Sequence, residues 1–266
     1  MASPPCAPQF TESFSLAAWQ KRAVPSHFAS WHYRHDECEE WHSHDKAQLT
    51  YASEGALQIH TADGIWTLPP GRALWIPAGQ PHRTHAQGQV TTCNYYCAES
   101  RHIAEFVPLM ASPLAHELLA ALIRHTQSEA KPGEAVWLME HLLRLELAQG
   151  AVATVPFLPL PRERRLKQVA QRLMQDPQSE AGIEGLGTAV GASTRTLSRL
   201  FRHDTGLTFS QWRQQLLLLK SVGLMAQGHS VENTARQLGY VNGSTFNAMF
   251  RKTLGETPQR YWRQGI

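Results

Sequence analysis

The last third of this 266-residue chain contains an internal repeat, which constrains the fold more than any other feature of the sequence. The segment Gly191–Trp212 aligns with Gly239–Tyr261 at an offset of 49 residues, which falls to 48 residues upstream of the turn in each copy. Each copy reads as a short apolar helix, a tight turn at or after a glycine, and a second helix with polar side chains. This order predicts two helix-turn-helix motifs, in which the second helix enters the major groove of DNA.

The stretch between the two copies predicts one continuous helix. Residues Ser210–Ala226 are rich in Leu and Gln, and Gly223 is the one helix breaker among them. Such a helix would be roughly 25 Å long at about 1.5 Å per residue. A strut of that length would hold two DNA-reading helices near one turn of the duplex apart, roughly 34 Å.

Charge is divided unevenly along the chain, although the formal net charge of the whole is only +3. The residues from Arg162 onward include 15 Lys and Arg against 7 Asp and Glu, a net charge of +8, whereas residues 1–161 carry −5. A basic segment joined to an acidic one indicates a polyanionic partner for the basic part. Of the 14 histidines, 12 lie on the acidic side, so the two parts differ in chemistry as well.

The charge changes sign at a proline-rich stretch. Residues 155–161 contain three prolines, and proline removes a backbone donor and disfavours helix in the residue before it. This pattern predicts an extended linker. We therefore expect three parts: a domain at residues 1–154, a linker at 155–161 and a second domain at 162–266.

The first domain reads as short strands followed by helices. Leu57–His60 and Ile65–Leu68 flank a turn signal and predict a hairpin, and further short strands between residues 48 and 97 indicate a small antiparallel barrel or sandwich. Two apolar periodic stretches predict helices at Ser112–Thr126 and Glu134–Gln149. These helices either cover the barrel or also form a dimer interface, and the sequence does not choose between the two. The expected fold class is a multidomain α+β protein with an all-α C-terminal domain.

The C-terminal repeat resembles the AraC/XylS family of transcription regulators over about the last hundred residues. The matching positions are Arg195–Phe201, Thr205-Gly206, Gly239-Tyr240, Phe246-x-x-x-Phe250-Arg251-Lys252 and Gly255-x-Thr257-Pro258-x-x-Tyr261. A single helix-turn-helix pattern arises easily by chance, whereas two at this spacing with the terminal Thr-Pro-x-x-Tyr do not. The resemblance implies a sequence-specific regulator that binds double-stranded DNA.

The resemblance also implies which side chains touch DNA. Base edges would be read by Arg195, Ser198 and Arg199 in the first motif and by Ser244 and Asn247 in the second. Arg202, Arg251 and Lys252 follow the two helices and would contact phosphates, which position the protein without specifying sequence. Family members often carry a long polar residue where Ala248 stands, so the second motif is expected to read fewer bases.

The N-terminal domain resembles the cupin barrel at two motifs. The motifs are His42-x-His44-x-x-x-Gln48 with Gly55, and Gly71 with Pro77-x-Gly79-x-x-His82. Cupins that keep every position use three histidines and a glutamate as metal ligands, and Gln48 stands where the glutamate is usual. The resemblance implies a divalent metal site at His42, His44, Gln48 and His82, and neutral imidazoles suit Zn, Ni, Fe or Cu.

A metal site is one of two interpretations of these histidines. Regulators of this family commonly keep the barrel as a small-molecule pocket without metal, so the effector is expected to be either a small molecule or a metal ion. The expected function is a transcription regulator whose DNA binding is controlled by that effector, without enzymatic activity and acting as a homodimer. The alternative functions are a metal-dependent cupin enzyme with an appended DNA-binding domain, and an architectural DNA-binding protein whose barrel only dimerises.

The remaining sequence features indicate a cytoplasmic protein. The Met1–Phe10 stretch has no signal-peptide pattern, and no apolar run is long enough to predict a membrane span. The four cysteines, Cys6, Cys38, Cys93 and Cys97, follow no disulfide-framework spacing, which suits a reducing compartment.

Overall fold

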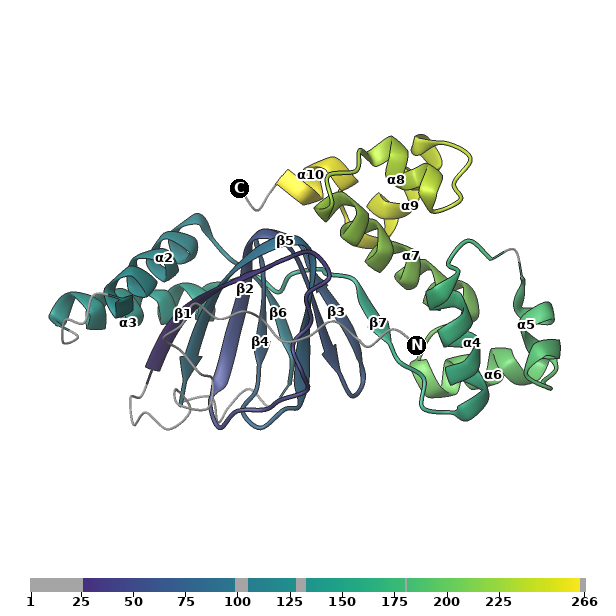
Figure 1. The fold of residues 1–266 in the computed structure, drawn as a ribbon, viewed down its shortest axis with the longest axis horizontal. Helices are drawn as coiled ribbons and strands as arrows, with labels where there is room; N and C mark the ends of the chain where they lie inside the picture. Colours follow the sequence, from purple (N-terminus) through teal and green to yellow (C-terminus); the bar gives the residue numbers. More distant parts are fainter. Residues whose placement is uncertain (1–25, 99–104, 128–132, 180, 264–266) are drawn as a thin grey trace.

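The computed structural model describes residues 26–98, 105–127, 133–179 and 181–263, so Cys6 and the Met1–Phe10 stretch lie outside the described residues. A curved antiparallel sheet forms the N-terminal part, with two helices at one side and a helical domain at the other (Figure 1). The strands are β1 (Ser26–Tyr33), β2 (Ala47–Thr61), β3 (Gly64–Leu68), β4 (Arg72–Ile76), β5 (His82–Cys97), β6 (Val107–Met110) and β7 (Phe157–Pro159). The helices are α2 (Pro113–Gln127), α3 (Glu134–Gln149), α4 (Arg164–Gln175), α5 (Ile183–Ala189), α6 (Thr194–Thr205), α7 (Phe209–Ala226), α8 (Val231–Gln237), α9 (Gly243–Leu254) and α10 (Pro258–Arg263).

Two long strands organise the sheet. β2 and β5 pair from Ala47↔Cys97 to Thr61↔His82, and the sheet order is β1-β5-β2-β3-β7, with β4 paired to β2 and β6. The register shifts on either side of Glu54, next to Gly55, whose φ is +70° and whose Cβ position lies 2.2 Å from the Gln89 carbonyl oxygen. Only glycine fits this bulge, which bends both strands and curves the sheet.

The expected fold class, a sheet-rich N-terminal domain with an all-α C-terminal domain, is confirmed, but the sheet is open and does not close into a barrel. Among the described residues, β1 pairs with β5 alone and β7 with β3 alone. β7 lies in the stretch predicted as a linker, and Leu158 pairs with Ile65. The prolines in and beside this strand, Pro156, Pro159 and Pro161, lack the N–H groups that a further strand would need, so the sheet ends there. The hairpin was predicted correctly, since Leu57↔Leu68 and His60↔Ile65 are paired.

Helices α2 and α3 pack on the other end of the sheet. Leu119 and Leu122 of α2 are fully buried against strand residues such as Leu49, and Leu143 of α3 joins the same core. The Glu140 carboxylate fixes α3 on the sheet, because its Oε1 accepts hydrogen bonds from Ser26, Tyr95 and Arg144. The second predicted helix, Glu134–Gln149, coincides with α3, and the first begins one residue later than predicted. No helix among the described residues has the length and apolarity to cross a membrane.

The repeat in the sequence becomes a repeat in structure. α5 and α8 are both 7 residues long, and α6 and α9 are both 12 residues long. The N-cap side chains of Ser193 and Asn242 accept hydrogen bonds from backbone N–H groups three residues later, and Gly206 and Gly255 end the helices in the left-handed conformation. The two predicted helix-turn-helix motifs are therefore confirmed, and the predicted strut is α7.

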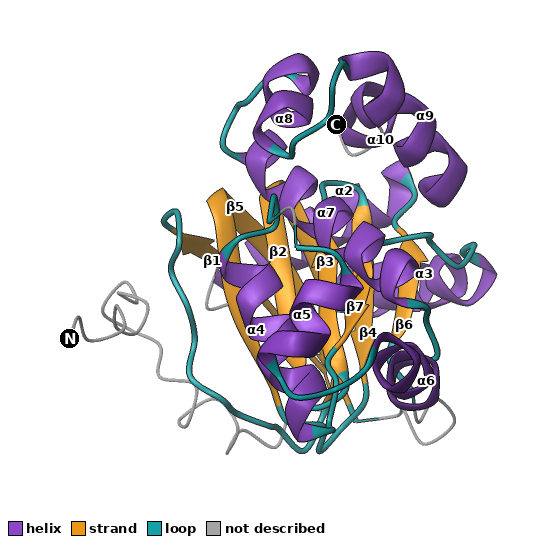
Figure 2. Cartoon of the chain, turned by 90° about the vertical axis from the view of Figure 1, so that its right-hand side faces the viewer, coloured by secondary structure: helices purple, strands orange, loops and turns teal. Residues whose placement is uncertain are grey.

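Helix α7 also joins the helical domain to the sheet, as Figure 2 shows. Trp212 is fully buried and donates its indole N–H to the Pro159 carbonyl oxygen at 2.8 Å. At the other end of α7 the backbones touch, because a Cβ on Gly88 would lie 2.4 Å from the Ala226 carbonyl oxygen. Gly88 has φ +79°, so both its conformation and this contact favour glycine.

A buried arginine makes a further connection between the two parts. Arg72 of β4 is 2% exposed, lies 4.5 Å over the ring of Tyr261 and places Nη2 3.8 Å from Glu256 Oε1. The Tyr261 hydroxyl donates to the Thr154 carbonyl oxygen at 3.0 Å. The second helix-turn-helix motif is thereby attached to β4 and to the chain that follows α3.

We predict that acid destabilises the sheet domain through His60. Burial, followed by the nearby Arg83 and His85, lowers the pKa of His60 to about 3, and its Nε2 is buried without a hydrogen-bond partner among the described residues. The unfolded chain takes up this proton near pH 6.5, so stability is lost as the pH falls from 6.5 towards 3. His60→Leu should reduce this loss, measured as melting temperature against pH. His203→Ala, at an exposed position, is the control, and equal pH profiles for all three proteins would contradict the prediction.

Candidate functional site

Helix α6 exposes the side chains that were predicted to read bases in the first motif. Arg195, Ser198 and Arg199 are all exposed, whereas Leu197 and Phe201 on the opposite face are fully buried. The apolar face fixes the helix in the domain core, and the polar face remains free for a partner. Arg202, predicted to contact phosphate, is also exposed.

Helix α9 presents a shorter polar surface. Ser244, Arg251 and Lys252 are exposed, whereas Asn247 is half-buried beside a surface cleft. Gly243 is buried, because a Cβ there would lie 2.3 Å from Glu232 Oε2 in α8. Val241, which the sequence analysis did not select, is 95% exposed in the longer turn that precedes α9. Its only signal in the sequence is the extra residue of that turn.

The structure brings the three predicted histidine ligands together at one end of the sheet. His42 forms a backbone bridge with His82, the first residue of β5, and His44 lies two residues further along. One nitrogen from each ring lies within 4.8 Å of the others. Both His42 and His44 precede β2, which begins only at Ala47, so an irregular segment carries the two rings.

Each of the three rings is oriented by a backbone carbonyl group. Nδ1 lies 2.9 Å from the Glu40 oxygen in His42, 2.6 Å from the Lys46 oxygen in His44 and 2.8 Å from the Gln80 oxygen in His82. A carbonyl oxygen can only accept, so Nδ1 carries the proton in His42 and His82, and the lone pair is on Nε2, as in metal-binding histidines that donate from the other nitrogen. In His44 both nitrogens face acceptors, because Nε2 lies 2.8 Å from the Gln48 side-chain oxygen, so the neutral ring donates to one of the two.

Burial keeps the imidazoles of His44 and His82 neutral. His44 and His82 are 5% and 1% exposed. Burial lowers the pKa of His44 below its ordinary value, and it lowers the pKa of His82 to about 3 against the opposing effect of the hydrogen bond to Gln80. A neutral imidazole is the form that binds a metal ion, so these rings are ready to act as ligands without first losing a proton.

Gln48, the fourth predicted ligand, lies beside the cluster. Its side-chain Oε1 is 2.8 Å from His44 Nε2, and its Nε2 donates to Asn94 Oδ1 at 2.9 Å. Asn94 in turn donates to Thr92 at 2.9 Å. This row of buried polar side chains on β2 and β5 holds the amide of Gln48 at the histidines.

A small polar cavity opens next to His42. It leaves about 20 Å³ for a water-sized molecule, and its lining includes Glu39, Gln48, Asn94 and Tyr96. Glu39 was not selected from the sequence, although it stands three residues before His42. The Glu39 Oε2 atom lies 4.0 Å from His42 Nε2.

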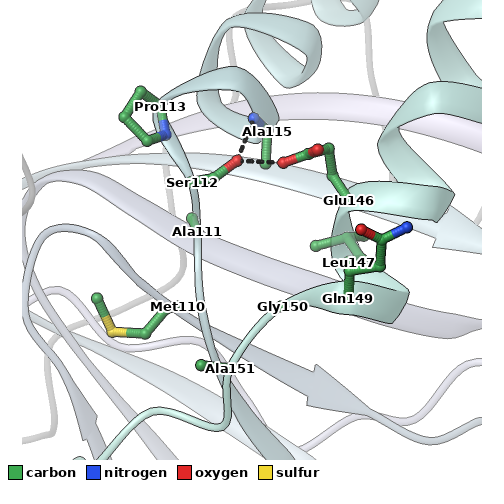
Figure 3. A pocket seen from close by; sticks show the side chains of 10 residues that line it. All are labelled: Met110, Ala111, Ser112, Pro113, Ala115, Glu146, Leu147, Gln149, Gly150 and Ala151. Atoms are coloured by element: carbon green, nitrogen blue, oxygen red, sulfur yellow. Dashed lines mark hydrogen bonds between the residues drawn. The ribbon is translucent and has the colours of Figure 1, made fainter.

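A groove at the start of α2 and the end of α3 lacks comparable chemistry. The groove of about 470 Å³ between α2 and α3 in Figure 3 is lined largely by backbone and apolar groups. Its main polar side chains satisfy each other, because Ser112 donates to Glu146 Oε2 at 2.7 Å and also caps α2 through Ala115 N. Neighbouring histidines outside the cluster are likewise engaged elsewhere: His85 pairs with Asp36, and His35 accepts from Gly88 N.

Comparison with known protein families accounts for nearly the whole described chain. Residues 25–182 match the family described as an AraC-like ligand binding domain. Residues 186–264 match the family described as a helix-turn-helix domain. The histidine cluster therefore lies in the ligand-binding match, and both recognition helices lie in the other.

Individual proteins give the same result. The chain is 31% identical over 225 residues to the HTH-type transcriptional regulator NimR of Escherichia coli, covering 83% of this chain and 81% of NimR. It is 34% identical over 215 residues to the HTH-type transcriptional regulator RipA of Corynebacterium glutamicum, covering 81% of this chain and 61% of RipA. Among solved structures, ToxT of Vibrio cholerae aligns over 91% of this chain and 99% of its own at 9% identity, with a TM-score of 0.39.

The two helix-turn-helix motifs, the two family matches and the similarity to NimR lead to one assignment. This chain belongs to the AraC family of transcription regulators, with an AraC-like ligand-binding domain followed by a helix-turn-helix DNA-binding domain.

Proposed function

We propose that this regulator changes its affinity for DNA when a divalent transition metal binds to His42, His44 and His82. The observation that carries the proposal is the convergence of three imidazoles, one nitrogen of each lying within 4.8 Å of the others. Each Nδ1 lies at a backbone carbonyl group, which leaves Nε2 lone pairs on His42 and His82, and a bound ion would replace the contact between His44 Nε2 and the Gln48 oxygen. Neutral imidazoles suit Zn, Ni, Fe or Cu. Gln48 would add a neutral oxygen donor from the side of His44.

The size of the adjoining cavity favours a metal ion over a small organic effector. Pockets for organic ligands enclose about 300–1,000 Å³. The space beside His42 is about 20 Å³, enough for one water molecule or an ion. The same volume argues against a metal-dependent cupin enzyme with an appended DNA-binding domain, because the cavity that the described residues leave beside His42 is too small for an organic substrate. We therefore infer that the chain acts without catalysis.

The DNA contacts are part of the proposal. Arg195, Ser198 and Arg199 read base edges from α6, whereas Ser244 and Asn247 do so from α9. Arg202, Arg251 and Lys252 contact phosphates. Since Gly243 is buried and Ala248 has no polar reach, α9 contributes fewer base contacts than α6.

The division of labour follows the predicted parts of the chain. We assign effector binding and dimerisation to residues 1–154 and DNA binding to residues 162–266, with 155–161 as the connection. This connection carries β7, so it is a strand of the sensor's sheet as well as the route to α4. A regulator that binds DNA acts where the DNA is, which we take to be the cytoplasm.

We further propose that the chain is a homodimer joined through α3. Val136, Met139, Leu143 and Leu147 face the domain core, whereas Trp137, Leu138, Leu142 and Leu145 are 41–62% exposed on the other side. The three leucines follow a four-then-three spacing, which is that of a coiled-coil seam. A second copy of α3 offers the same stripe and would cover it by two-fold symmetry.

The metal proposal predicts opposite effects for two substitutions in the cluster. His44→Ala should weaken Zn²⁺ binding by about 10–100-fold or more, because one of three nitrogen donors is lost. Gln48→Glu should tighten it, because the amide becomes an anionic oxygen donor. Affinity is measured by competition with a chromophoric chelator, and metal content by mass spectrometry.

The control is His32→Ala, at an exposed histidine outside the cluster. Each protein is also titrated with operator DNA, with and without chelator. Wild-type protein that remains metal-free after loading, or whose DNA affinity does not respond to chelator, would refute the metal as effector.

The assignment of DNA roles makes a second prediction. Arg195→Ala and Arg199→Ala should each weaken specific binding by about 1–3 kcal/mol and relax base preference at one position. Arg202→Ala should weaken binding to all DNA sequences alike. It should also reduce the slope of log affinity against log salt concentration by about 1. Binding is measured on operator and random duplexes over a salt series, with Arg34→Ala in the sensor domain as control. Equal losses on both duplexes for Arg195 and Arg199 would show that they do not read bases.

The dimer proposal is tested by charging the exposed stripe. Leu138→Glu combined with Leu142→Glu should raise the dimer dissociation constant by at least about tenfold, since two apolar contacts become buried charges. Sedimentation equilibrium gives the constant. Leu114→Glu, at an exposed leucine on α2, is the matched control. A dimer that survives the double substitution would exclude α3 as the interface.

A further inference from the structure

Glu39 occupies a defined place beside the histidine cluster. It lies in the segment between β1 and β2, where bridges Cys38↔His85 and His42↔His82 pair the backbone with β5 on both sides of it. The Glu39 N–H donates to the Thr84 carbonyl oxygen at 2.9 Å. The position of its carboxylate is therefore set by the sheet and not by a free loop.

The two carboxylate oxygens of Glu39 have different surroundings. Oε1 accepts a hydrogen bond from the Tyr33 hydroxyl at 2.8 Å, and Oε2 lies 4.0 Å from His42 Nε2. Tyr33 is 6% exposed. Its hydroxyl holds one oxygen, which directs the other towards His42. Metal-binding carboxylates are commonly held in this way by a second hydrogen-bonding group.

The cavity lies between this carboxylate and the amide of Gln48. Glu39, His42 and Gln48 all line it, so oxygen donors from two elements flank a space of about 20 Å³. In a tetrahedral site with bonds of about 2.1 Å, two ligand atoms lie roughly 3.4 Å apart. The 4.0 Å between Glu39 Oε2 and His42 Nε2 thus exceeds that separation by roughly 0.6 Å. The group of ligand atoms within 4.8 Å of one another holds the three histidines without Glu39, so the carboxylate has to move towards His44 and His82 to bind the same ion.

We propose that Glu39 is the carboxylate ligand of the metal site. It supplies the anionic oxygen that Gln48 lacks. Glu39 does so from the segment between β1 and β2, whereas Gln48 lies on β2. Three neutral imidazoles leave a divalent ion with its full charge in a largely buried place, and one carboxylate halves that charge. Tyr33 is then a positioning residue for Glu39. This inference depends on the metal effector proposed above.

The test compares the Zn²⁺ affinity of Glu39→Gln with that of the wild-type protein. The substitution keeps an acceptor for the Tyr33 hydroxyl but removes the charge. We expect affinity to fall by about tenfold or more. Glu40→Gln is the matched control, because Glu40 is the next residue, its side chain is exposed, and the substitution removes the same charge. The variant keeps the backbone carbonyl group that orients His42. Its affinity should change less than about twofold. Absorption of the Co²⁺-loaded proteins reports the ligand set independently, and the bands should shift in Glu39→Gln alone.

A second pair of variants separates ligation from a structural role. Gln48→Glu placed in the Glu39→Gln protein should restore affinity, since it returns one carboxylate to the site. Tyr33→Phe should weaken binding less than Glu39→Gln does, because it leaves the carboxylate in place. Circular dichroism and melting temperature of the metal-free proteins check that each variant is folded.

The outcomes distinguish the two proposals. Wild-type protein that binds no Zn²⁺ or Co²⁺ overturns the metal effector and the role of Glu39 with it. Wild-type binding that is unchanged in Glu39→Gln, with unchanged Co²⁺ bands, overturns Glu39 as ligand and leaves the histidine site standing. The role of Glu39 as ligand is also overturned by a third result. In that result Glu39→Gln weakens Zn²⁺ binding, Gln48→Glu does not restore it, and the Co²⁺ bands of Glu39→Gln match those of Glu40→Gln.

Discussion

The pairing of β2 with β5 runs from Ala47↔Cys97 to Thr61↔His82, and strands β1, β3 and β4 each pair with one of these two strands. β5 pairs with β1 along its second half and with the Cys38 and His42 bridges along its first. It therefore places His82 against His42, and β2 places Gln48 against Asn94. A shift of one residue in this register would turn the side chains of one strand to the other face of the sheet. Gln48 and Asn94 would then no longer meet beside the histidines. The bulge at Gly55 fixes the register, because no other residue fits against the Gln89 carbonyl oxygen.

The two parts of the chain share one packed structure. Ile65 and Leu158 of the sheet lie in the same core as Leu197 and Phe201 of the first helix-turn-helix motif. Ala56 of β2 lies in the core of the second motif. Helix α7 runs between both cores, so it cannot move relative to the sheet without disturbing buried apolar contacts. The DNA-binding motifs are consequently held by the sensor domain in this conformation, and a change in the sheet reaches both of them.

The sequence predicted the helical domain well and the sensor domain less fully. The repeat located both motifs because caps such as Ser193 and Asn242 are local signals, and a local signal needs no knowledge of the rest of the chain. The hairpin at Leu57–Leu68 was also local. The open sheet was missed because closure depends on which distant strands pair, and prolines that suggested a linker also permit an edge strand. Glu39 was missed for the same reason: only the pairing of its segment with β5 brings it to the histidines.

The segment between β1 and β2 has two sets of neighbours. Glu39 and His42 face the cluster, whereas His35 accepts from Gly88 N, and Asp36 lies near enough to Lys220 of α7 to oppose the lowering of that lysine's pKa by burial. Gly88 itself touches the end of α7. Under the function proposed above, ligand binding and domain docking are in thermodynamic linkage through this shared segment, and linkage is reciprocal. A ligand that moves this segment towards the cluster changes the free energy with which α7 packs on the sheet. DNA that separates α7 from the sheet then changes the affinity for the ligand by the same factor. DNA is, in that sense, a second effector of the sensor.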